Sequence, residues 1–200
     1  DDFSMNDLKV ASAAGGFSGT INGRMTGIPD IEQTRLTAKI DRFNLTSEGL
    51  GLFLSEWSDG KDIDLGKYAK GHTFMVDADV DGLLNSLDVN AGIYSLIGRV
   101  QADMKVEGLI DNDTPVGIRG TATTDDLDIG KIISSDLVGP VTLRTGMKAE
   151  FGEKISAKID SLFIDRLNLN RYDYSGIKAS GALSENMFNG TIIASDPSLN

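Results

Sequence analysis

Apolar and polar residues alternate with a period of two along most of this chain, and that pattern constrains the fold more than any other feature. The clearest run covers residues 100–107, where Val, Ala, Met and Val alternate with Gln, Asp, Lys and Glu. Comparable runs occupy residues 17–25, 36–40, 116–122, 141–151, 155–159, 177–183 and 188–194. A period of two is that of a β-strand with one buried face. Glycine, with 23 of the 200 residues, interrupts most stretches long enough for a helix.

Turn-forming residues separate these runs and set the direction of the strands. Short links are expected at 111–115, 151–153 and 184–186, and short links join antiparallel strands. Two other segments, 47–57 and 125–134, favour a helical turn or two, because in each a small or acidic residue precedes a short apolar stretch. The sequence therefore predicts about eleven strands and two helical interruptions.

The predicted fold class is all-β: an elongated, mostly antiparallel curved sheet of the β-taco or open β-sandwich kind, with two short helical interruptions. We expect residues 1–200 to form a single elongated β segment excised from a larger protein, because the chain starts without an initiator methionine or a signal peptide.

A weak internal repeat divides this segment at about 1–60, 61–124 and 125–200. It is carried by matches of residues 62–68 with 126–132 and of residues 37–41 with 156–160. Repeated strand groups of this kind are expected to stack into an elongated sheet, because each group buries its apolar face only beside its neighbours.

The composition excludes several functional classes. The chain has 19 Lys and Arg against 30 Asp and Glu, a net charge of −11, which argues against nucleic acid and against charge-driven docking to an anionic bilayer. Without cysteine there is no disulfide and no thiolate chemistry. The single histidine, His72, excludes a site that needs two imidazoles. No phosphate-binding glycine loop or Gly-x-Ser-x-Gly motif is present, so we expect neither an enzyme nor a cofactor.

One motif resembles a calcium-binding loop. Asp77, Asp79, Asp81 and Asp88 match its positions 1, 3, 5 and 12, with Gly82 at position 6. The residues before Asp77 favour a strand rather than the required helix, and continued alternation would place the first three aspartates on a solvated face. We therefore favour no metal site, and a calcium-stabilised secreted β-sandwich is kept as an alternative.

The apolar side of the alternation defines the candidate binding surface. The pattern is the same for a closed core and for an open groove that holds acyl chains, so both stay open at this point. The candidate groove or core residues are Ile21, Met25, Ile40, Val100, Met104, Val106, Ile118, Leu143, Met147, Ile159, Ile177 and Ile192.

The C-terminal third carries a family resemblance. A Tyr-x-Tyr strand at 172–174 leads to Gly-x-Leu at 181–183, Phe-x-Gly at 188–190 and Asp-Pro-x-Leu at 196–199. Residues 127–133 and 139–143 add a Leu-Asp-Ile-Gly-Lys helix and a glycine-led strand. Together they resemble a recurring unit of the TamB branch of the AsmA-like proteins of Gram-negative bacteria, particularly the Bacteroidetes type. The resemblance covers residues 60–200. Residues 3–58 share only the general pattern of glycine and alternating apolar residues.

The resemblance implies a periplasmic protein anchored to the inner membrane, with a long β structure that encloses a hydrophobic groove. It implies a non-enzymatic role in phospholipid transport between the inner and outer membranes and in outer-membrane biogenesis. The expected ligands are phospholipid acyl chains, and the expected outer-membrane assembly partner binds through other parts of the full-length protein. The alternative is a scaffold that binds outer-membrane protein clients by strand pairing.

Overall fold

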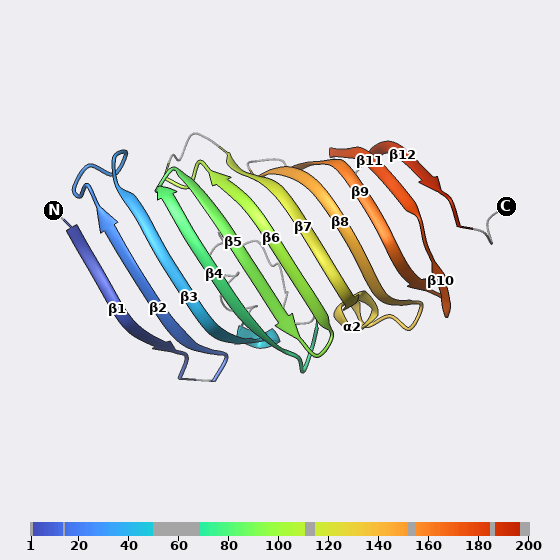
Figure 1. Cartoon of the computed structure of the whole chain (residues 1–200), viewed down its shortest axis with the longest axis horizontal. Helices are drawn as coiled ribbons and strands as arrows, with labels where there is room; N and C mark the ends of the chain where they lie inside the picture. The colour runs from blue at the N-terminus through green and yellow to red at the C-terminus, as the bar shows by residue number, and fades with distance from the viewer. Residues whose placement is uncertain are drawn as a thin grey trace.

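The computed structural model describes residues 2–13, 15–49, 69–110, 115–151, 155–184 and 187–196. In these residues the chain forms one open antiparallel sheet of twelve strands, which does not close into a barrel (Figure 1). The predicted all-β class is confirmed.

The strands follow one another across the sheet in chain order, as a meander (Figure 1). Short β10 lies off this path and pairs only with β9. The strands are β1 (Asp2–Ala11), β2 (Phe17–Thr26), β3 (Arg35–Thr46), β4 (Thr73–Leu83), β5 (Ser86–Ser95), β6 (Gly98–Glu107), β7 (Val116–Asp128), β8 (Val138–Phe151), β9 (Ile155–Leu169), β10 (Tyr172–Tyr174), β11 (Ile177–Ser184) and β12 (Met187–Ala194).

Both predicted helical interruptions contain residues that are helical in the structure. Helix α2 (Ile129–Ile133) lies inside the predicted segment 125–134, but residues 125–128 belong to β7. Its N-cap is Asp128, whose carboxylate accepts a hydrogen bond from the Lys131 N–H at 3.0 Å. Residues 47–49 are helical, and the rest of the predicted segment 47–57 lies outside the described residues.

Most predicted strands are found, and two more strands appear. Alternation at residues 100–107 corresponds to β6, and the extended reading of residues 74–81 corresponds to β4. Strands β1 and β5 were not predicted. The predicted turns fall largely on residues 111–114, 152–154 and 185–186, outside the described residues.

Only one of the two proposed repeat boundaries lies within the described residues. The first, at 60/61, lies outside the described residues, and the second, at 124/125, falls inside β7. The threefold division therefore stays a prediction.

Three strands contain a bulge built in the same way. Asp7 in β1, Arg42 in β3 and Asp126 in β7 have φ values of 51°, 48° and 49°, and the pairing register shifts at each. Each bulge N–H donates to a side-chain oxygen on the next strand: Asp7 to Asn22 Oδ1 at 2.8 Å, Arg42 to Asp77 Oδ1 at 2.6 Å, and Asp126 to Thr142 Oγ1 at 3.2 Å. A bulge bends the strand and increases its twist.

The fully buried apolar residues lie near the rim of the sheet. Among the described residues they are Leu87, Ala69, Ile97 and Val141. The last three meet the corner where β7 runs into α2: the Ala69 N–H donates to the Ile132 carbonyl, the Asp128 N–H donates to the Ile97 carbonyl, both at 2.7 Å, and Val141 pairs with Leu127. No second layer of described residues covers the middle strands, which form a single layer.

Candidate functional site

One face of the sheet is apolar from β2 to β12. Residues directly opposite each other in antiparallel strands point to the same face, so the register traces rows of side chains across the strands. The central row consists of Ile21, Ile40, Ala78, Ala91, Ala102, Ala122, Thr145, Leu162, Ala179 and Ile192. We call the surface that contains this row the apolar face.

All twelve predicted groove residues lie on the apolar face. Ile21, Ile40 and Ile192 belong to the central row itself. The other nine stand in rows on either side of it. Their register partners are apolar side chains of neighbouring strands: Met25 pairs with Leu36, Val100 with Ile93, Met104 with Val89, Val106 with Ile118, Leu143 with Ile164, Met147 with Ile159, and Ile177 with Ile164.

The exposure of this face is intermediate rather than low. Eleven of the twelve side chains are half-buried, whereas Ile192 on the edge strand β12 is 68% exposed. Neighbouring side chains shield one another within the sheet, but no described element packs above its middle. Such a face can bind an apolar partner without rearrangement of the strands.

The opposite face carries the charges, and we call it the polar face. Ion pairs link neighbouring strands there: Arg35 with Asp81, Lys105 with Asp88 at 3.2 Å, Arg119 with Glu107 at 3.2 Å, and Arg144 with Asp165 at 3.3 Å. In each pair at least one side chain is largely exposed, so the pair contributes little to stability. Because charged side chains stay in contact with water, these pairs determine which face of the sheet is exposed to solvent.

The structure does not gather the calcium-loop candidates into one site. Asp77, Asp79 and Asp81 follow one another along extended β4, so Asp77 and Asp81 stand roughly 13 Å apart. Asp81 pairs with Arg35, and Asp88, opposite it on β5, pairs with Lys105. In the described part of the chain no group of three or more metal-ligating side chains is arranged to hold an ion.

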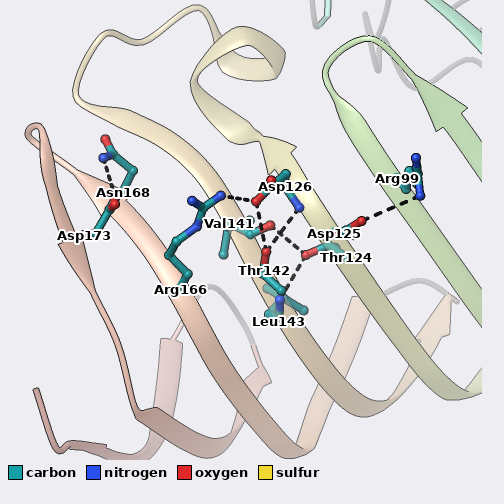
Figure 2. Close-up of polar contacts among 10 residues, drawn as sticks. All are labelled: Arg99, Thr124, Asp125, Asp126, Val141, Thr142, Leu143, Arg166, Asn168 and Asp173. Atoms are coloured by element: carbon teal, nitrogen blue, oxygen red, sulfur yellow. Dashed lines mark hydrogen bonds and ion pairs between the residues drawn. The ribbon is translucent and has the colours of Figure 1, made fainter.

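A polar network fixes the sheet where β7 bulges (Figure 2). Asp126 accepts hydrogen bonds from Arg166 and from the Thr142 hydroxyl, the latter at 3.3 Å. The Thr124 hydroxyl donates to the Val141 carbonyl at 3.0 Å and accepts from the Leu143 N–H at 3.1 Å. Because these groups satisfy one another, the network positions the strands and offers no unpaired nucleophile.

Among the described residues, two carboxyl groups have lowered pKa values. The pKa of Asp160 is lowered, chiefly because the Lys158 ammonium donates a hydrogen bond to it at 2.6 Å. The pKa of Glu48 is lowered by its own backbone N–H and by the Ser47 hydroxyl, which donates at 3.2 Å. Both side chains are exposed. A lowered pKa keeps a carboxylate ionised near neutral pH, which suits ion pairing rather than proton donation.

The described residues also form hollows on the polar face. One of about 640 Å³ lies over β3–β6, with Tyr94 and Gln101 in its lining. A smaller one of about 390 Å³ lies over β7–β9, beside Phe163. The sequence analysis missed both. Each hollow includes a glycine on the polar side of a strand, Gly92 in β5 and Gly146 in β8, and such a glycine is the sequence signal that could have found them.

Comparisons with protein-family models, with curated proteins and with solved structures found no significant match. Within the described ranges, none of the helices has the length and apolarity needed to cross a bilayer.

Proposed function

We propose that this chain is a non-enzymatic segment of a periplasmic AsmA-like protein of the TamB type, and that its apolar face carries phospholipid acyl chains between the inner and outer membranes. The observation that carries the proposal is the apolar face of an open sheet, whose central row extends from Ile21 to Ile192 with Thr145 as its one polar member. The sequence resemblance of residues 60–200 supports the assignment to that family.

The chemistry of the face suits an acyl chain. Strand pairing already satisfies the backbone hydrogen-bonding groups, so an apolar ligand needs no directional partner. Each methylene removed from water contributes about 0.8 kcal/mol. Because the rows run across the strands, a ligand can pass from strand to strand along the length of the sheet.

The first experiment is native mass spectrometry of the chain, purified without detergent and then incubated with phosphatidylethanolamine–phosphatidylglycerol vesicles. We expect bound phospholipid at a defined stoichiometry, and organic extraction then identifies it. A chain that carries no phospholipid either as purified or after incubation contradicts the proposal.

A pair of charge variants localises the site. Met104→Glu places a carboxylate in the middle of the apolar face, and we expect phospholipid binding to fall at least about tenfold because a charge there costs several kcal/mol when desolvated. Thr121→Glu adds the same charge on neighbouring β7 but on the polar face, so binding should be unchanged. Circular dichroism checks that both variants fold.

Two results would count against the apolar face as the binding surface. Equal binding by both variants would place the lipid elsewhere. Unfolding of Met104→Glu alone would make Met104 part of a closed core, in agreement with the rival reading of the alternation.

A second candidate function, strand pairing with an outer-membrane protein client, is favoured by β12. This edge strand has no charged residue and no proline, and Met187, Ile192 and Ile193 are 74%, 68% and 57% exposed. Edge strands without such protection pair readily with another extended chain. Successive N–H groups of a strand point to opposite sides, so only one of Ile192→Pro and Ile193→Pro removes the N–H that faces outward. That variant should lose client binding. Retained binding in both variants would exclude β12 as the binding edge.

A further inference from the structure

The hollow of the polar face that contains Tyr94 has the properties of a second binding site. It lies over β3–β6, on the side of the sheet opposite the apolar face, and its volume is about 640 Å³. That volume is in the range of small-molecule sites in proteins. It is lined by acidic, basic, amide and aromatic side chains together.

The floor of the hollow is a tyrosine ring over a glycine. A Cβ built on Gly92 would lie 2.7 Å from Tyr94 Oη and 3.0 Å from two of its ring carbons. The Tyr94 side chain therefore leans back along β5 and covers Gly92, which only a residue without a side chain permits. Because Tyr94 also lines the hollow, it gives an otherwise polar surface an aromatic contact.

Hydrogen-bonding groups surround this ring in two rows. Asp77 and Gln101 stand on either side of Gly92, and Asp79, Asn90 and Asp103 form the next row. Two of the carboxylates are held in place: Asp77 accepts from the Arg42 N–H at 2.6 Å, and Asp103 accepts from the Asn90 amide. Asp79 is exposed and has no hydrogen bond or ion pair with another described residue.

We propose that this hollow binds a neutral saccharide. Sugar hydroxyls both donate and accept hydrogen bonds, which matches a lining of carboxylates, two amides and the cations of Lys39 and Arg42. The apolar C–H face of a sugar ring packs on an aromatic ring such as Tyr94. The carboxylates repel anionic ligands, and the polar lining does not suit an acyl chain. The proposal uses the opposite face from the lipid proposal and does not depend on it.

The test is binding of the fluorescently labelled full chain to an array of neutral oligosaccharides, followed by titration with the best ligand. Tyr94→Ala should lose binding, whereas Tyr94→Phe should keep most of it because the ring remains. At exposed positions, Asp79→Asn replaces a charged acceptor with an amide donor and Gln101→Ala removes an amide, and we expect the Kd to rise about tenfold in each. The matched control is Thr123→Ala. Thr123 lies in the same row as Gln101 but on the next strand and outside the hollow.

Three outcomes overturn the proposal: no binding to any neutral glycan, binding that survives both Asp79→Asn and Tyr94→Ala, or binding lost equally in Thr123→Ala. Spermidine is titrated in parallel. Spermidine binding that Asp79→Asn abolishes, without glycan binding, would make the hollow an organic-cation site. Met104→Glu should bind glycan normally, so failure of the saccharide proposal and failure of the lipid proposal are distinguishable.

Discussion

Gly120 on β7 occupies a position that other residues fit poorly. Its φ is +155°, and an added Cβ would lie 1.9 Å from the Asp103 carbonyl oxygen on β6. On the same strand, Gly117 has open space around its missing Cβ and no positive φ. The two glycines therefore have different physical roles, and they also stand on opposite faces of β7, since Gly120 pairs with Met104 and Gly117 with Glu107.

Gly120→Ala should lower the free energy of unfolding by about 2 kcal/mol, because the methyl group forces β6 and β7 apart and the backbone conformation is strained. Gly117→Ala should be neutral or stabilising by up to about 1 kcal/mol, since it restricts the unfolded chain. Urea denaturation of both variants measures the difference. Equal effects would show that the close approach at Gly120 does not control strand pairing.

The ion pair between Lys158 and Asp160 predicts a pH effect. A carboxyl group whose pKa is lower in the folded state stabilises the fold above its unfolded pKa, and this contribution is lost as the pH falls through the folded pKa. The loss should therefore occur below the ordinary aspartate value of 3.8. In Lys158→Ala, NMR titration should find the pKa of Asp160 raised toward that value; an unchanged pKa would exclude the ammonium as its cause.

Within one strand, alternation correctly predicts the face of the sheet to which each side chain points. Across a bulge, the same prediction fails. Val100, Met104 and Val106 share a face as expected. Ile159 and Leu162, three positions apart, also share it, because the register of β9 shifts between them. No period-two pattern contains that information, since the extra residue is recognised only through its pairing partners.

The bulges of β1, β3 and β7 show how elements of this sheet are shaped. Each uses a residue with φ near +50° and a side chain on the next strand that accepts the freed N–H. An unpaired N–H would cost free energy, so the accepting side chain determines whether the bulge is tolerated. Asp126 also accepts from Arg166 of β9 (Figure 2), so this bulge connects three strands.

Removing one of these acceptors should destabilise the sheet locally. Thr142→Val keeps the shape of the side chain but leaves the Asp126 N–H without its partner, and we expect a loss of about 1 kcal/mol in the free energy of unfolding. Thr121→Val is the control, because exposed Thr121 has no side-chain hydrogen bond to another described residue. Amide exchange at Asp126 should rise in the first variant only; no change there would exclude Thr142 as the partner that holds the bulge.

Elements with strong local signals could be predicted, and others could not. Helix α2 follows from an acidic residue before a short apolar stretch, although its cap is Asp128 and the preceding Asp126 forms the bulge. Strand β5 was not predicted, although Leu87, Val89, Ala91 and Ile93 alternate with polar residues and glycine in the sequence.

In the described part of the molecule, substantial contacts join each strand of the sheet to its hydrogen-bonded neighbours, and α2 packs against β8. Stability in such an arrangement approximates a sum of nearest-neighbour terms, as in repeat proteins. Local opening at one edge therefore need not open the centre.

Proline variants in two strands test this property by hydrogen exchange. Successive N–H groups of a strand point to opposite sides, so one of Ile192→Pro and Ile193→Pro removes a hydrogen bond to β11. That variant should speed exchange in β11 and β12 and leave β4–β7 protected. Ala102→Pro in central β6 should open both β5 and β7. Loss of protection throughout the sheet in the edge variant would show a single cooperative unit instead.

The sequence predicts the open antiparallel sheet but not how many layers it has. A closed sandwich and a single layer place the same residues on one apolar face, as Met104 and Met147 illustrate. The difference is decided by whether another element covers that face, which is a long-range property. The groove role of the twelve residues therefore remains a prediction for the lipid experiments.

The meander also has an evolutionary consequence. Neighbouring strands lie about 4.8 Å apart, so one hairpin adds roughly 10 Å to the length of the sheet and extends both faces without altering their cross-section. Duplication or deletion of a hairpin preserves strand direction and leaves the remaining register pairs intact. A lineage with this architecture can therefore lengthen or shorten both faces by changing the number of hairpins within one gene, with no new fold to discover.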